Sequence, residues 1–597
     1  MHRSVHLIED CEGGTIERPD LPTWAPVQLL GIAAMNDRRR WALAAVAAGA
    51  IVAVIRRWTS WGRDEYAIWP DEPAQLAIAR FLGGGTRWNM DDHSVWRPLF
   101  GTLLAPVHWF TDDPVTVLHV ALAMNALLGG VAAALLVIVA RRLTPLSPRW
   151  AAGAAVVVSA TPAVLFTTEF VFAESLVAPL FLGALLATLH LHEAPTLRTG
   201  VVAAVLAGAA FGAHSRMLTL TLIVVGVVVL AAARRRIPLR DAALVIGVAA
   251  LVVAVVEVFT RWLVSRLWDQ PSTRNSPAGV AEQIAGGPAV LLSAIGQAWY
   301  LLVASIGVIA YGLVVMVRRA RGAQGPTPAG DASVVLATVG ACFALSVVFM
   351  SDRWRSDQLV YGRYNDAVVT PVLVVGIAAL LGAIALPRLL RVAAGAATGI
   401  MVGGLVLRWF RGEVLSDSNG LEPMILGLQP FATSATSIDV IRISALAALL
   451  TLALAVAVTV AAGRNSSSHA PAARGGIVAV AALSVLLAFG WVRTERIVDR
   501  FWDDSGDVSA VQQLRSGVLA DGVAVDFHLP PGSTSTNRMM LYQFYLPHTE
   551  FTVVNDPGGA SADLVFARLE ADADTVADPP ARLIWLDPRG AYGLFRR

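Results

Sequence analysis

Hydrophobic residues occur along this chain in long, nearly uninterrupted runs separated by short polar connections. Most runs approach the roughly 20 apolar residues that a helix needs to cross a bilayer. They lie near residues 41–61, 115–140, 150–168, 173–190, 200–214, 217–233, 241–260, 289–317, 332–350, 365–386, 391–407, 443–462 and 475–492. The pattern predicts a mainly α-helical, polytopic membrane domain over residues 35–492, with about thirteen transmembrane helices.

The two ends of the chain depart from this pattern. Residues 1–34 are mixed and polar, whereas Met35 is followed by three arginines and then by the first apolar run. We interpret residues 1–34 as a disordered leader or a mis-assigned start, with Met35 as the alternative first residue. Residues 493–597 contain short apolar segments such as "GVAVDFHLP", "EFTVVN" and "DLVFARL" between turn residues, which predicts a small α/β domain.

Arginines in the short connections predict the orientation in the membrane. The cytoplasmic ends of transmembrane helices carry an excess of basic residues. One side of the predicted bundle collects the basic clusters at Arg38–Arg40, Arg141–Arg142, Arg234–Arg236, Arg318–Arg321 and Arg388–Arg391. This places the N-terminus in the cytoplasm. With an odd number of helices, it places the C-terminal domain outside, together with residues 62–114, 261–288, 351–364 and 408–442.

Composition agrees with a multi-pass protein of the cytoplasmic membrane and excludes several other classes. The 597 residues are 56% hydrophobic and 15% charged, and the mean hydropathy is +0.61. The net charge of +2 comes without a basic, aromatic-interleaved motif, so we expect no nucleic-acid partner. Lysine is absent and alanine, valine and glycine abound, which indicates a GC-rich genome of actinobacterial type. Cys11 lies near the N-terminus and Cys342 lies inside an apolar run, so no disulfide framework is expected.

An acidic pair follows the first apolar run, in "WPDEPAQLAIARFLGGG". Asp71 and Glu72 precede Pro73 and a short helical pattern, so capping and a favourable first-turn charge explain part of the motif. Capping does not explain why this helix begins at the outer membrane face. There the loop continues to His93 and Arg97, which are candidate substrate-binding residues.

Further charged residues fall at other outer turns. "FTTEFVFAES" places Glu169 and Glu174 between two apolar runs, where they are either solvated or face a cavity. "GAHSRMLTL" and "YGRYNDAVVTP" place Arg216, Arg363 and Tyr364 at turns that enter helices. Arginine suits phosphate because it stays charged and presents a planar fork of donors, although snorkelling to lipid headgroups is the alternative role. The chain contains no paired-histidine metal motif, P-loop, dinucleotide fingerprint or Gly-x-Ser-x-Gly elbow.

In their order and shared sidedness, these motifs resemble the GT-C superfamily of polytopic membrane glycosyltransferases. The acidic motif of the first outer loop matches "WPDEPAQLAIARFL", the second acidic residue matches Glu174, and the later Arg-Tyr motif matches "YGRYNDAVVTP". The resemblance covers most of residues 35–390. It departs from each subfamily: the Trp-Trp-Asp-type motif of oligosaccharyltransferases is missing.

The resemblance implies a reaction and roles. A polyprenyl-phosphate sugar is the donor, and a hydroxyl of a cell-envelope glycan, lipid or protein is the acceptor. Asp71 is the general base, with Glu72 in support, and direct displacement inverts the anomeric carbon. Arg216, Arg363 and Tyr364 bind the donor phosphate. Glu174 either orients the acceptor or shares a divalent cation, Mg²⁺ or Mn²⁺, with Asp71.

Two other functions fit a polytopic chain. A transporter or flippase of lipid-linked sugars would carry charges and broken helices near the membrane midplane. A non-catalytic envelope scaffold would depend on residues 493–597 and not on Asp71. The charged residues gather at one predicted face, which favours the transferase.

Overall fold

The computed structural model describes most of the helical domain and the elements of the C-terminal domain. The described residues are 25–64, 71–90, 96–268, 287–324, 328–351, 355–383, 386–416, 424–431, 437–463, 490–495, 523–528, 537–554, 561–568, 582–586 and 592–597, with the single positions 281, 284, 481, 483, 484, 488, 511, 514 and 519.

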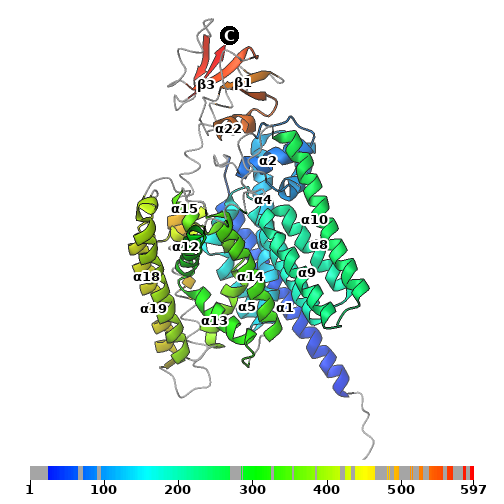
Figure 1. Cartoon of the computed structure of the whole chain (residues 1–597), viewed down its shortest axis with the longest axis vertical. Helices are drawn as coiled ribbons and strands as arrows, with labels where there is room; N and C mark the ends of the chain where they lie inside the picture. The colour runs from blue at the N-terminus through cyan, green and yellow to red at the C-terminus, as the bar shows by residue number, and fades with distance from the viewer. Residues whose placement is uncertain are drawn as a thin grey trace, which may run out of the picture.

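The helical domain begins with a long helix and continues through helices of very different length (Figure 1). The helices are α1 (Ala25–Thr59), α2 (Asp71–Leu82), α3 (Leu99–Leu104), α4 (Pro114–Leu143), α5 (Pro148–Ser159), α6 (Pro162–Leu165), α7 (Glu174–Glu193), α8 (Leu197–Ala213), α9 (Leu218–Ala233), α10 (Leu239–Leu267), α12 (Pro288–Ala304), α13 (Val308–Ala320), α14 (Ala329–Phe349), α15 (Ser356–Leu359), α16 (Arg363–Asp366), α17 (Thr370–Ala378), α18 (Leu386–Ser416) and α19 (Val440–Gly463). Single turns are η1 (Ala105–Trp109), η2 (Phe166–Glu169), η3 (Ser215–Met217), η4 (Ala379–Ala383) and η6 (Leu426–Leu428).

The described residues contain eight helices long and apolar enough to span a membrane, or up to ten if each bent pair is one span. The expected number of about thirteen is therefore not reproduced in this part of the chain. The run 289–317 is not one helix: α12 and α13 meet at 110°, where Ile306 and Gly307 have positive φ. In the predicted run 150–168, helix α5 ends at Ser159, shortly before Pro162 begins α6. The predicted run 475–492 lies mostly outside the described residues.

Helix α1 begins inside the segment that was predicted to be a leader or a mis-assigned start. The helix begins at Ala25, so residues 25–34 are helical, and residues 1–24 lie outside the described residues. The stretch "APVQLLGIAA" is rich in alanine and leucine, which favour helix formation even before the membrane-spanning part begins.

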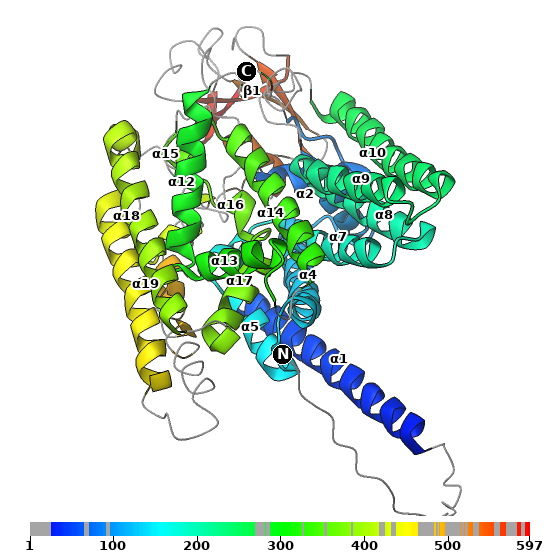
Figure 2. The ribbon, with the colours of Figure 1, turned by 60° about the horizontal axis from the view of Figure 1, so that its bottom comes forward.

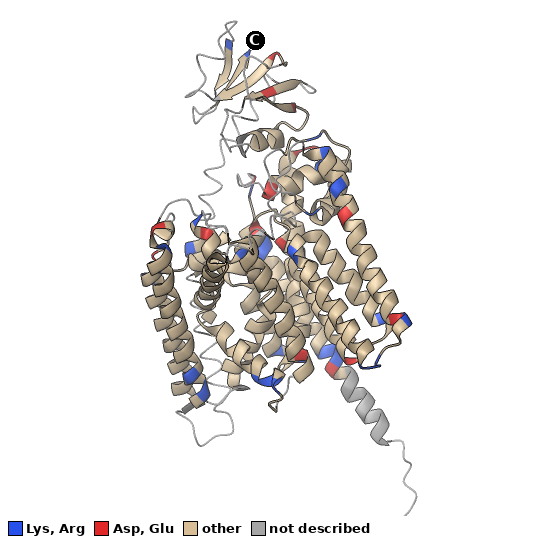
Figure 3. Ribbon diagram, in the orientation of Figure 1, with Lys and Arg blue, Asp and Glu red and all other residues tan. Residues whose placement is uncertain are grey.

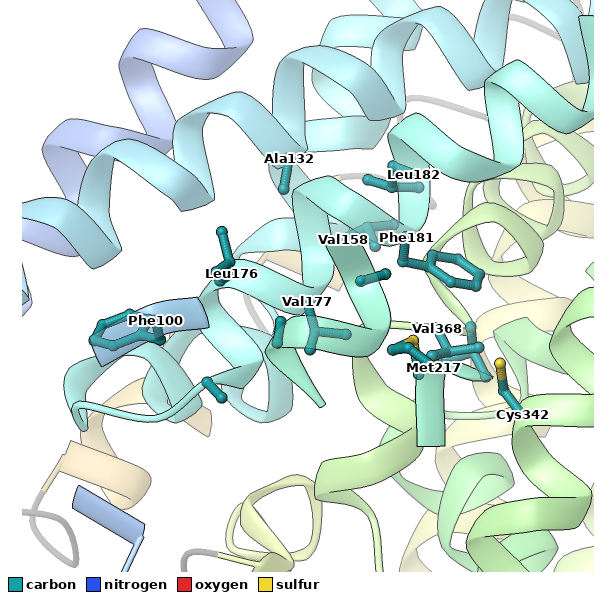
Figure 4. Packing of buried hydrophobic residues seen from close by; sticks show 14 of the residues in the cluster. Phe100, Ala132, Val158, Leu176, Val177, Phe181, Leu182, Met217, Cys342 and Val368 are labelled. Atoms are coloured by element: carbon teal, nitrogen blue, oxygen red, sulfur yellow. The ribbon is translucent and has the colours of Figure 1, made fainter. Parts of the chain in front are cut away.

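The helices pack side by side in three neighbouring groups (Figures 1 and 2). One group joins α1, α4 and α5, a second joins α7, α8, α9 and α10, and a third joins α18 and α19, which reach the rest through α12 and α13. Where the groups meet, buried side chains such as Leu176, Phe181 and Met217 form a continuous apolar core (Figure 4). This core supports the end of the bundle that carries the candidate site.

The C-terminal domain contains the predicted strands and one helix. The strands are β1 (Ala524–His528), β2 (Glu550–Val554), β3 (Leu564–Arg568), β4 (Arg582–Leu586) and β5 (Tyr592–Arg596), and the helix is α22 (Asn537–Tyr545). The sheet has the order β2-β1-β3-β5-β4, with β1 parallel to β2 and β3, and β5 antiparallel to β3 and β4. A mainly helical membrane domain with a small α/β domain is thus confirmed.

The helix α22 docks on the segment formed by α2 and the residues that follow it. Asn89 and Gln543 exchange two hydrogen bonds, from Asn89 N to Gln543 Oε1 at 2.7 Å and from Gln543 Nε2 to Asn89 O at 3.2 Å. Arg80 and Thr86 donate to the carbonyl of Pro547. The C-terminal domain is therefore fixed to the helix that starts at Asp71.

Charged residues gather at the two ends of the bundle, while the helices between them are almost uncharged (Figure 3). The end remote from the C-terminal domain has a cavity lined by Arg141, Arg142, Glu193, Arg236 and Asp331. These residues come from the C-terminal ends of α4 and α7, the α9–α10 connection and the start of α14. The opposite ends of α7 and α14 line a second cavity, described next.

Candidate active site

The candidate site is a cavity at the end of the bundle nearest the C-terminal domain. Its empty volume is about 740 Å³, including space open to solvent, and six short segments of the chain line it. Asp71 begins α2, Glu174 begins α7, His214 lies in the turn before α9, and Arg363 begins α16. Each therefore sits at the start of a helix or in a turn, where side chains reach past the apolar packing of the bundle.

Arg363 joins the two carboxylates of the cavity. Its Nη1 donates to Asp71 Oδ2 at 2.7 Å, and its Nη2 donates to Glu174 Oε2 at 2.8 Å. The guanidinium carbon lies 3.8 Å from the ring centre of Phe172, which covers one face of the group. The side chains of Arg363 and Glu174 are 4% and 3% exposed, whereas that of Asp71 is 28% exposed. Asp71 is thus the carboxylate with the freest access to an incoming group.

Asp71 is held on its other oxygen by Trp96, whose indole Nε1 donates to Oδ1. Arg363 and Trp96 together orient this carboxylate between them. Gln75, one turn further along α2, donates to Arg97 O and accepts from Gly101 N, so the loop after α2 is fixed to the same helix. Trp96 was not predicted as a site residue, and no spacing in the sequence distinguishes it from the other outer-loop tryptophans.

Arg216 lies behind the cavity and does not line it. Its side chain is 0% exposed, and none of its three guanidinium nitrogens has a hydrogen-bond partner among the described residues. The ring of Tyr364 covers it, with the guanidinium carbon 4.0 Å from the ring centre. Its Nη2 is 3.9 Å from Glu174 Oε1, an oxygen that also has no hydrogen-bond partner among the described residues.

His214 is a third neighbour of Glu174, with Nε2 4.0 Å from Oε1. Its Nδ1 accepts a hydrogen bond from the backbone N–H of Arg216, so the neutral ring carries its proton on Nε2, facing Glu174. Burial, followed by the positive charges of Arg216 and Arg363, holds the pKa of His214 well below its usual value. The ring is therefore neutral near pH 7.

The other predicted site residues take different places. Glu72 is buried and its Oε1 accepts from Val171 N at 2.8 Å, which ties α2 to the loop before α7. Glu169 is buried in η2 and does not line the cavity. Arg97 does line it, and is paired with Glu257 at 2.7 Å. His93 lies outside the described residues.

Buried hydrogen bonds join α16 to α12. Asn365 Nδ2 donates to Gln297 Oε1 at 2.8 Å, and Tyr300 OH donates to Asp366 Oδ2 at 3.0 Å. Both partners belong to α12 and are fully buried. Gly362 passes directly over Tyr300: a Cβ at this position would lie 1.9 Å from the ring carbon Cζ. The motif "GRYND" thus carries the site arginine on one side and its anchors on the other.

The guanidinium of Arg363 lies between the two carboxylates that were predicted to share a divalent cation. A divalent cation shared by Asp71 and Glu174 would have to take the place of the Arg363 guanidinium, which already bridges them. Within the described residues, no group of three or more His, Cys, Asp or Glu side chains is placed to hold a metal.

Comparison with known proteins addresses the fold. No protein-family model and no curated protein sequence matches the chain. Among solved structures, the chain is similar to ArnT from Cupriavidus metallidurans bound to undecaprenyl phosphate, with a TM-score of 0.51 and 14% identity over 92% of this chain and 97% of that one. The fold matches that of ArnT.

The apo state of ArnT gives a TM-score of 0.50 over the same shares of both chains. The arabinosyltransferase EmbB from Mycobacterium smegmatis gives 0.42 at 17% identity, over 75% of this chain and 41% of that one. The likeness to ArnT extends over both domains of this chain, so the helical domain and the small C-terminal domain predicted from the sequence share the fold of ArnT.

Proposed function

We propose that the protein is an inverting glycosyltransferase that moves a sugar from a polyprenyl-phosphate donor to a hydroxyl of an envelope glycan, lipid or protein. The observation that carries the proposal is the Asp71–Arg363–Glu174 constellation in a cavity at one end of a membrane-spanning bundle. A base beside a buried cation is what a hydroxyl attack with a phosphate leaving group requires. ArnT, which shares the fold, has been crystallised with a polyprenyl phosphate.

In the proposed reaction, Asp71 accepts the proton of the acceptor hydroxyl as its oxygen attacks the anomeric carbon. The bond from that carbon to the phosphate oxygen breaks, and its electron pair leaves with the polyprenyl phosphate. Arg363 stabilises the negative charge that develops on the leaving oxygen, because a preorganised donor in a water-poor site acts without reorganising. Attack opposite the leaving group inverts the carbon.

Residues around these two have supporting roles. Trp96 orients Asp71 through Oδ1, as Arg363 does through Oδ2, and Tyr364 lines the cavity beside Arg363. Arg97, which lines the cavity, is held by its salt bridge to Glu257 of α10. Glu72 shapes the site by fixing α2 to the loop before α7.

The reaction class is tested by incubating the purified chain with radiolabelled polyprenyl-phosphate sugars and envelope acceptors. Formation of a labelled, inverted glycoside supports the proposal, and intact donor with every sugar and acceptor contradicts it. The shared divalent cation remains a prediction that the same assay tests. If Asp71 and Glu174 hold Mg²⁺ or Mn²⁺, EDTA abolishes transfer and the metal restores it, whereas the Arg363 bridge predicts transfer in EDTA.

A second part of the proposal is the orientation, with the site and the C-terminal domain outside the cytoplasmic membrane. Its support is the basic character of the opposite end of the bundle. The test uses a chain without Cys11 and Cys342 that carries one new cysteine, either Arg198→Cys at the start of α8 or Ser561→Cys in the C-terminal domain. The labelling of the two variants is compared on intact cells. A membrane-impermeant maleimide should label position 561 and spare position 198, and the reverse result would invert the proposed topology.

A further inference from the structure

The arrangement around Glu174 shows a carboxylate between two arginines, of which it binds only one. Oε2 is 2.8 Å from Arg363 Nη2, while Oε1 is 3.9 Å from Arg216 Nη2 and 4.0 Å from His214 Nε2. Hydrogen bonds from nitrogen to oxygen are about 2.7–3.2 Å long, so a movement of roughly 1 Å would complete both missing bonds. A side-chain rotation of Glu174 is enough for such a movement.

The donors that Glu174 would gain are otherwise unused. Arg216 is completely buried with three guanidinium nitrogens that have no hydrogen-bond partner in the described part of the chain. A buried charge without hydrogen bonds is costly, because its desolvation is not compensated. Glu174 Oε1 is likewise buried without a partner among the described residues. The resting arrangement therefore leaves a matched donor and acceptor just out of reach of each other.

Arg363 gains a free edge when Glu174 moves. Its Nε has no hydrogen-bond partner among the described residues, and its Nη2 is occupied by Glu174 alone. Nε and Nη2 form the side-on edge of a guanidinium, the edge that binds phosphate through two parallel bonds. Glu174 thus occupies half of the phosphate-binding edge, and an incoming phosphate would also meet its negative charge.

We infer that Glu174 is handed over from Arg363 to Arg216 and His214 when a polyprenyl phosphate binds, which opens the side-on edge of Arg363 to the phosphate. Arg216 is then a positioning residue that acts through Glu174 and does not touch the ligand. This rests on the proposed function, because it assigns the occupant of the same cavity. It also explains why Arg216 lies behind Tyr364 and outside the cavity lining.

The charges are consistent with this exchange. Asp71 and Glu174 balance Arg363 and Arg216 in the resting site, so the cluster is neutral. A phosphodiester donor adds one negative charge, which would face Glu174 directly if Glu174 stayed on Arg363. After the handover, Glu174 faces Arg216 while the phosphate faces Arg363, and each anion has its own buried cation.

Binding of undecaprenyl phosphate to the full chain in lipid nanodiscs tests the inference. Arg216→Gln should weaken binding by about tenfold to a hundredfold, because Glu174 then has no charged partner to move to. Glu174→Gln should bind as tightly as the unmodified chain or tighter. In the Glu174→Gln background, adding Arg216→Gln should change the affinity by less than about threefold, because a neutral amide needs no charged partner.

The inference would be overturned if Arg216→Gln lowered the affinity for undecaprenyl phosphate equally in the unmodified chain and in Glu174→Gln. Such a result would mean that Arg216 acts on the phosphate without Glu174. Arg56→Gln is the matched control, because Arg56 is also a buried arginine whose Nε and Nη1 have no hydrogen-bond partner among the described residues, but it lies in α1 outside the cavity. It should leave the affinity unchanged.

If Arg216→Gln does not fold, Glu174→Gln decides alone, and a loss of affinity greater than about tenfold rejects the handover. Failure of the inference can be told from failure of the proposed function. A chain that shows the handover but transfers no sugar retains the inference and loses the reaction. A chain that binds no polyprenyl phosphate contradicts both.

Discussion

At the scale of single residues, Asp71 combines a helix start with a place in the site. Asparagine caps helices about as well as aspartate, so Asp71→Asn separates the two roles. We expect transfer to fall by about 10²- to 10⁴-fold, because an amide cannot accept the acceptor proton. The measurement is the initial rate of label transfer, with thermal unfolding recorded in parallel.

Asp113→Asn provides the control for that experiment. Asp113 caps α4 through a hydrogen bond from Thr116 N and lies outside the cavity lining, so its replacement should leave transfer unchanged. Survival of activity in Asp71→Asn would show that Asp71 is only a cap.

His214 gives a pH dependence of stability at the same scale. Its pKa is lowered in the folded state by burial and by the charges of Arg216 and Arg363, so the unfolded chain binds more protons below about pH 6.5. The contribution of neutral His214 to the free energy of unfolding is therefore fully present above that pH. It is lost as the pH falls, by at most about 1.4 kcal/mol per pH unit. Melting temperatures from pH 7.5 to 5 should drop less in His214→Asn than in the unmodified chain. Parallel profiles of the two proteins would contradict the assignment.

At the scale of elements, α16 depends on a close approach to α12. Gly362→Ala places a methyl group inside the ring of Tyr300, which the buried surroundings cannot relieve without moving α16. We expect a loss of at least about 1–3 kcal/mol of stability and a clear loss of transfer. Denaturation and transfer assays measure the two effects.

Gly395→Ala is the matched substitution, since a Cβ there meets no atom within 4 Å in α18. It should be neutral or slightly stabilising. Equal behaviour of the two variants would mean that the Gly362 contact does not hold α16 in place.

The sequence predicted most of the membrane-spanning runs and the strands of the C-terminal domain because both follow local periodicity. It also located Asp71, Glu174 and Arg363 at turns of one predicted face, and the structure places all three around one cavity. Local patterns do not encode which side chains meet over 292 residues, as Asp71 and Arg363 do. The 110° bend between α12 and α13 was missed because Ser305 to Gly307 look like ordinary members of an apolar run.

At the scale of the whole molecule, the C-terminal domain is connected to the site through α2. Gln543→Ala removes the two hydrogen bonds to Asn89, with an expected cost of about 1–3 kcal/mol to the docking. Hydrogen exchange should accelerate in residues 71–90 and transfer should fall, while Arg582→Ala on the exposed edge of β4 should change neither. Unchanged exchange in Gln543→Ala would show that α2 holds its position without the domain.

This docking has a consequence for biogenesis. Asn89 and Gln543 are 454 residues apart, and Arg80 and Pro547 are 467 residues apart. The ribosome therefore completes nearly the entire polypeptide before α2 can meet its partner. A nascent chain with all of its membrane helices inserted still lacks these contacts, so α2, the helix that begins at Asp71, gains them only at the end of synthesis.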